Sequence, residues 1–155
     1  GCLVLSGLSV MVNVIQSEAL ATFLDQSVEQ DYLEENLGWL AIASRYVRDE
    51  LPADSRVLML WEGRSFYCGS KCDPDEILDA WRDANFRKTS SQSIGDYWVE
   101  QGYSHLLYFQ PAAQFVAQDP EHFLPLELYG LETALANLTK LRDFGGAYIL
   151  YEIAP

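Results

Sequence analysis

The feature that most constrains the fold of this chain is the run Val57–Trp61, five apolar residues with no polar residue among them. A run of this kind is typical of a strand covered on both faces, because a strand with one wet face alternates apolar and polar residues. It follows an amphipathic segment that Pro52 ends, and it precedes Glu62-Gly63-Arg64. The order of helix, turn, buried strand and polar loop predicts an α/β sheet with this strand at its centre.

Further helical and strand-forming segments alternate along the chain. Apolar stripes, capping residues and β-prone runs identify them. The predicted helices span 17–24, 37–51, 73–85, 93–102 and 131–144, and the further predicted strands span 65–68, 104–109 and 147–153. This alternation predicts a three-layer α/β/α sandwich around a small, mainly parallel, Rossmann-like sheet. Because only Gly145-Gly146 separates the last helix from the last strand, the direction of that strand stays open.

Length and charge limit the class of protein. The 155 residues suffice for one domain with a core of ordinary size. Lys and Arg total 10 against 23 Asp and Glu, which gives a formal net charge of −13. An acidic surface of this strength repels phosphate backbones, so nucleic acid is excluded as a partner.

The first seventeen residues, 1–17, carry no charged side chain. About 20 apolar residues are needed to cross a bilayer, so this leader is expected to be the end of a transmembrane helix, and residues 18–155 a single soluble α/β domain. Three alternatives stay open: the core of a signal peptide, an N-terminal core strand or helix, and a lipoprotein start at Cys2. A signal peptide is disfavoured, because no basic segment precedes the apolar stretch and no A-x-A site follows it.

Candidate binding residues follow from the position of the buried strand. In open α/β sheets, ligands bind outside the carboxyl ends of the strands, which makes Glu62 and Arg64 the first candidates. His105, at the start of the next apolar run, is a third. The competing interpretation is that the charged pair is only the solvated rim of a loop and that His105 is a satisfied core histidine. His122, near Asp119 and Glu121, is a weaker candidate for a cation site.

Several familiar catalytic and cofactor motifs are absent from the sequence. There is no G-x-G-x-x-G, no P-loop and no G-x-S-x-G nucleophile elbow. Cys68 and Cys72 have no second Cys or His pair beside them, which argues against zinc. We therefore predict no catalytic residue, no cofactor and no metal.

Cys68 and Cys72 form a C-x-x-x-C pair in a loop that contains Gly69. The spacing allows a disulfide if the loop turns back on itself. In an oxidising compartment the two residues are expected to pair, whereas in a reducing one they stay ordinary thiols. The sequence leaves both states open.

Several short segments together carry a resemblance to a known family. They are LPADSRVL at 51–58, WEGR at 61–64, FY at 66–67, GYSHLL at 102–107 and LYEI at 150–153. In this order they resemble the extracytoplasmic C-terminal domain of bacterial multi-spanning glycosyltransferases, the class that uses lipid-linked sugars and is related to protein mannosyltransferases and aminoarabinose transferases. The similarity extends from about Tyr32 to Ile153.

The resemblance implies a parent chain with many transmembrane helices that transfers sugar from a polyprenyl-phosphate donor on the outer face of the cell membrane. The catalytic acidic residues of that family lie in a loop near its N-terminal end, and no position here corresponds to them. The chain is therefore expected to be a non-catalytic, extracytoplasmic accessory domain. Its expected partners are the membrane part of its own chain and a glycan or lipid-linked sugar.

Two other interpretations stay open. One is a free-standing α/β domain that binds a small ligand, or acts as an enzyme, at the strand ends through Glu62 and Arg64, with His105 or His122 assisting. The other is an interaction domain that holds a partner through a surface rich in tyrosine, of which the chain has nine.

Overall fold

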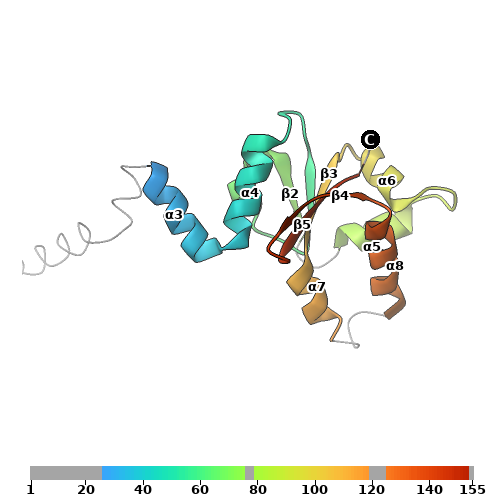
Figure 1. Cartoon of the computed structure of the whole chain (residues 1–155). Coiled ribbons are helices and arrows are strands. Elements are labelled where there is room, and N and C mark those ends of the chain that lie inside the picture. The colour runs from blue at the N-terminus through green and yellow to red at the C-terminus, as the bar shows by residue number, and fades with distance from the viewer. Residues whose placement is uncertain (1–25, 76–78, 119–124, 154–155) are drawn as a thin grey trace, which may run out of the picture. The chain divides into compact units, whose positions relative to one another are not determined.

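The computed structural model describes residues 26–75, 79–118 and 125–153 (Figure 1). The chain divides into two compact units, Gly1–Ala41 and Ile42–Pro155. The first unit contains α3, Gln26–Leu37. Helix α4, Trp39–Glu50, begins in the first unit and continues into the second. No helix in the described ranges has the length and apolar character needed to span a bilayer. The apolar leader and the helix predicted at 17–24 lie outside the described residues.

A five-stranded sheet, in the order β2-β1-β3-β5-β4, organises the described part of the second unit (Figure 1). Its strands are β1 Val57–Leu60, β2 Cys72–Asp75, β3 His105–Phe109, β4 Thr139–Phe144 and β5 Tyr148–Glu152. Strand β1 runs parallel to β2 and β3, whereas β5 runs antiparallel to β3 and β4. The predicted α/β class is confirmed, and the sheet is parallel at one end only.

The antiparallel end arises from the tight connection between β4 and β5. Gly145 and Gly146 both have positive φ, 62° and 71°, a conformation that glycine adopts without steric cost. This turn reverses the chain at once, and a parallel pairing would need a long crossover instead. The prediction of a mainly parallel sheet is therefore wrong for β5 and β4. The last strand, β5, whose direction the sequence leaves open, runs antiparallel to both of its neighbours.

The predicted helix 131–144 is wrong in its second half. Helix α8 spans Pro125–Ala136, and the chain then enters β4. The side chain of Asn137 donates to the Thr133 carbonyl at 2.9 Å, and Leu138 N bonds the Leu135 carbonyl at 3.1 Å, which closes the helix. The helical spacing of leucines that predicts a longer helix continues to Leu141. This residue is exposed, so it does not belong to a buried helical stripe.

The segments around the cysteines also differ from their predictions. The strand predicted at 65–68 is a 3₁₀ helix, η1, Ser65–Lys71. Residues 73–75, the described part of the helix start predicted at 73–76, belong to the edge strand β2, which tolerates Pro74 because an edge strand has a free side. Pairing with β1 overrides the local capping pattern. Helix α5 spans Asp79–Arg87, and Asp75 accepts a hydrogen bond from Ala80 N at 3.1 Å.

Other elements confirm the sequence interpretation. The helix predicted at 37–51 corresponds to α4, and Ser93 caps α6, Ile94–Glu100, in a full capping box with Asp96. Helix α7, Gln110–Val116, is not predicted. The reason is that Pro111 reads as a strand terminator, whereas it stands in the first turn of a helix, where a missing N–H costs nothing.

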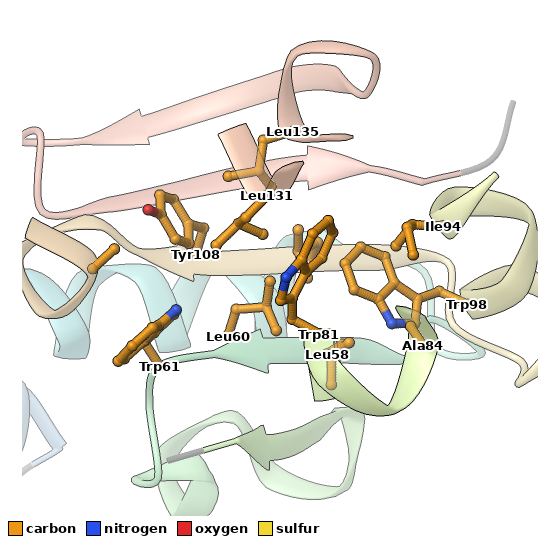
Figure 2. Packing of buried hydrophobic residues seen from close by; sticks show 12 residues of the cluster. Leu58, Leu60, Trp61, Trp81, Ala84, Ile94, Trp98, Tyr108, Leu131 and Leu135 are labelled. Atoms are coloured by element: carbon orange, nitrogen blue, oxygen red, sulfur yellow. The ribbon is translucent and has the colours of Figure 1, made fainter. Parts of the chain in front are cut away.

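The apolar run of β1 is buried on both faces, as its sequence predicts. Figure 2 shows Leu58 and Leu60 of β1 packed with Trp81 and Trp98 of α5 and α6, whose ring centroids lie 6.5 Å apart. Leu131 of α8 belongs to the same cluster. Elsewhere in the second unit, Tyr46 of α4 meets Phe144 of β4 edge-on at 5.6 Å. The expected three-layer sandwich stays a prediction.

Two helical glycines are predicted to respond oppositely to alanine. A Cβ on Gly95 would meet nothing closer than 3.5 Å, so Gly95→Ala should raise the free energy of unfolding by about 0.5 kcal/mol through helix propensity. A Cβ on Gly130 would lie 3.2 Å from the buried ring of Trp81. Gly130→Ala should therefore lower the free energy of unfolding by about 1 kcal/mol. Urea unfolding of both variants checks this, and equal effects would contradict the packing argument.

Candidate functional site

The polar residues after β1 gather at the carboxyl edge of the parallel strands. Trp61 has a φ of 67°, a left-handed conformation that ends the strand and turns the chain. Glu62, only 3% exposed, forms an isolated bridge with Asp75, whose N–H donates to the Glu62 carbonyl at 3.3 Å. Tyr148 begins β5 at the same edge, because it pairs with Phe109, the last residue of β3.

Glu62, Arg64 and Tyr148 form one hydrogen-bonded group, here called the strand-end cluster. The Arg64 guanidinium donates Nε to Oε1 and Nη2 to Oε2 of Glu62, both at 2.7 Å, and the Arg64 backbone N–H donates to Oε1 at 2.9 Å. The Tyr148 hydroxyl donates to Oε2 of Glu62 and accepts from Arg64 Nη2 at 3.2 Å. The Tyr148 ring stacks on Phe109 with centroids 4.6 Å apart. Both oxygens of the buried carboxylate are thus bonded within the protein.

The pKa values of the strand-end cluster are displaced away from neutrality. Burial raises the pKa of Glu62, but hydrogen bonds from Arg64 and Tyr148 outweigh it, and the pKa lies below its usual range. The hydrogen bond to Glu62 raises the pKa of Arg64. Burial, together with Glu62, raises the pKa of Tyr148. The cluster is a fixed ion pair with a neutral phenol, and a general acid or base needs a pKa near the working pH.

Asp75 is a second buried carboxyl at this edge. It is 6% exposed, and within the described ranges its Oδ2 has no hydrogen-bond partner. Burial raises the pKa of Asp75, although hydrogen bonds from backbone N–H groups oppose the rise. Sequence reasoning missed Asp75 and Tyr148 as members of this edge. Tyr148 lies 86 residues beyond Glu62, so local sequence gives no signal for the pairing.

The structure does not bring His105 to this edge. His105 pairs with Val57, at the amino end of β1, whereas Glu62 follows its carboxyl end. The imidazole is buried, with Nδ1 at 2.8 Å from the Ser104 hydroxyl. Burial lowers the pKa of His105, although the negative charge of the nearby Glu152 acts to raise it. The candidates Glu62 and Arg64 therefore share a cluster and His105 stands apart from it, while His122 lies outside the described residues.

Cys68 and Cys72 are joined by a disulfide, with Cα atoms 5.7 Å apart, that ties η1 to the start of β2. Cys68 is buried beside Met59 of β1, with the two sulfurs 4.0 Å apart. Lys71, between the cysteines, donates to carbonyls at the end of α4 and beyond it, including Leu51 O at 2.7 Å. The described residues contain no group of three or more His, Cys, Asp or Glu side chains placed to hold a metal ion.

Comparison of the chain with protein-family models, with curated proteins and with solved structures finds no match. At the edge where an α/β protein would bind its ligand, Glu62 and Arg64 bind each other.

The strand-end cluster predicts an asymmetric response to substitution. Arg64→Ala leaves the buried carboxylate without its countercharge and should lower the free energy of unfolding by about 3 kcal/mol. Glu62→Gln leaves a guanidinium whose side chain is 54% exposed and can be hydrated, so about 1–2 kcal/mol is expected. Chemical denaturation measures both. Arg87→Ala is the matched control, because it breaks an exposed Arg–Asp pair and should change stability by less than about 0.5 kcal/mol.

The pH dependence of stability should show the same cluster. Because the folded pKa of Glu62 lies below its ordinary value of 4.5, its contribution is fully present above that value and is lost as pH falls through the folded pKa. Between pH 7 and pH 3 the wild type should lose more stability than Glu62→Gln does. Parallel unfolding curves for the two proteins over this range would contradict the assignment.

Proposed function

We propose that this chain is a non-catalytic, extracytoplasmic accessory domain of a membrane glycosyltransferase that takes its sugar from a polyprenyl-phosphate donor. The observation that carries the proposal is the closure of the strand-end cluster. Glu62, the acidic residue of the WEGR segment, has both carboxylate oxygens bonded to Arg64 or Tyr148, and its pKa is held low. The segment that carries the family resemblance thus has a structural role here, which suits a domain whose catalytic residues lie elsewhere in the parent chain.

Two further features support this proposal. A disulfide such as Cys68–Cys72 persists in oxidising surroundings, which agrees with an extracytoplasmic location. Exposed aromatic side chains such as Phe66, which follows the strand-end cluster, and Phe115 of α7 provide apolar surface. We infer that the domain packs on the membrane part of its own parent chain, and that its helices complete an α/β/α layering around the sheet.

One observation favours a second candidate, a small-ligand-binding domain with its site at the strand ends. The buried Oδ2 of Asp75 has no hydrogen-bond partner within the described ranges and lies at the same edge as the strand-end cluster. In this alternative Glu62 and Arg64 would bind the ligand. In that case Arg64→Ala would abolish binding and hardly change the melting temperature, the reverse of the stability loss expected of a structural cluster.

Membrane fractionation of the native full-length product tests the accessory-domain proposal. An integral membrane enzyme should remain in the pellet after an alkaline carbonate wash, and its intact mass should far exceed the 17.5 kDa of this chain. In intact cells, Cys68 and Cys72 should react with an impermeant maleimide only after reduction. A product of about 17.5 kDa that the wash releases would overturn the proposal.

A further inference from the structure

A separate groove of about 480 Å³ lies among α5, α6 and α8, away from the strand-end cluster. Leu138 and Ile153 line it, and they flank the pair Thr139 and Glu152 at the amino edge of the parallel strands. The groove therefore lies at the edge opposite to the carboxyl edge, where α/β sheets usually bind their ligands. Its volume falls in the range of small-molecule sites, about 300–1,000 Å³.

Apolar side chains line part of this groove. They are Trp81, Ile94, Leu138 and Ile153. Gly130 contributes no side chain, so α8 approaches the Trp81 ring closely. Trp81 and Ile94 are buried in the core, whereas Leu138 and Ile153 are partly exposed. Leu138 and Ile153 therefore provide the surface against which the C–H face of a ring can pack.

Three polar side chains of the groove are amides that the protein holds in place by one end. Asn85 donates from Nδ2 to the Trp81 carbonyl at 2.9 Å, and Asn137 donates from Nδ2 to the Thr133 carbonyl at 2.9 Å. Gln92 accepts at Oε1 from Thr89 N at 3.3 Å. Within the described ranges, the other ends of these amides, Oδ1 of both asparagines and Nε2 of Gln92, have no hydrogen-bond partner in the protein. The groove thus offers two acceptors and one amide donor whose side chains are already oriented.

The charges of the groove nearly cancel. Its lining includes Lys88 and Asp96, and the Asp96 carboxylate is occupied in the capping box with Ser93. A strongly anionic ligand would also meet the net charge of −13 on the chain. The lining therefore favours an uncharged ligand that both donates and accepts hydrogen bonds around an apolar face.

We propose that this groove binds a neutral sugar ring. Sugar hydroxyls donate to Asn85 and Asn137 and accept from Gln92, while the C–H face of the ring packs on the apolar lining. The ligand class follows from the groove alone. That the sugar belongs to the acceptor or to the lipid-linked donor of a transferase rests on the proposed function.

The test is an NMR titration of the 155-residue chain with the methyl glycosides of glucose, mannose, galactose and N-acetylglucosamine. At least one glycoside should cause saturable amide shifts grouped at 81–96 and 130–138, with weak affinity. The absence of saturable shifts with all four would overturn the proposal. Inorganic phosphate serves as the competing probe: if phosphate alone shifts these amides, the groove is an anion site at Lys88 and the proposal is wrong.

Substitutions then locate the binding. Asn85→Leu and Asn137→Leu should each weaken binding of the responding glycoside about fivefold, since each loses one hydrogen bond. Asn36→Leu is the matched control, because Asn36 makes the same Nδ2 bond to a carbonyl four residues earlier but lies in α3, outside the groove lining. Equal weakening by the control, or none by the groove variants, would contradict the assignment.

The outcomes for the groove and for the proposed function are distinguishable. Sugar binding by a chain that is released from membranes would sustain the groove and overturn the glycosyltransferase proposal. Membrane retention of a large product whose domain binds none of the glycosides would do the reverse.

Discussion

The structure depends on strand β1, which lies between β2 and β3 in the sheet and is buried on both faces. A buried strand has no access to water, so a buried polar group at its end must be bonded within the protein. At the carboxyl end, the Glu62 carboxylate is bonded by Arg64 and Tyr148. The amino end differs, because its charged pair is exposed to water: the Arg56 side chain pairs with Asp73 at 2.6 Å and lies over the Tyr103 ring at 4.5 Å. Both ends of the central strand are thus fixed by contacts that cross the sheet.

This requirement explains why the charged pair after the strand does not form an open site. A buried carboxylate is tolerated when its countercharge and hydrogen bonds are supplied together, and the Arg64 fork supplies both. Tyr148 completes the set from β5, so the cluster also links the first strand to the last. The residues that would be first candidates for chemistry in an α/β sheet instead stabilise its edge.

The groove at the opposite edge differs in kind. Its amides are each held by one hydrogen bond and, among the residues that the structure describes, have no partner for their other end, whereas the strand-end cluster has both carboxylate oxygens bonded. Polar groups that are oriented but not saturated are suited to recognition, because little ordering entropy is lost on binding. The polar residues at one edge of the sheet therefore stabilise the fold, whereas those at the other edge form the groove that we propose binds a ligand.

Local pattern determined part of this fold by itself. The uninterrupted apolar run predicted β1, and the Ser93 cap predicted α6, because both signals act within a few residues. Tertiary structure decided the rest. Pairing with β1 turned the helix-like start at Asp73 into β2, and the closure at Asn137 ended a leucine stripe that continues in sequence. The contact of Glu62 with Tyr148 joins residues 86 positions apart, and only the folded sheet brings them together.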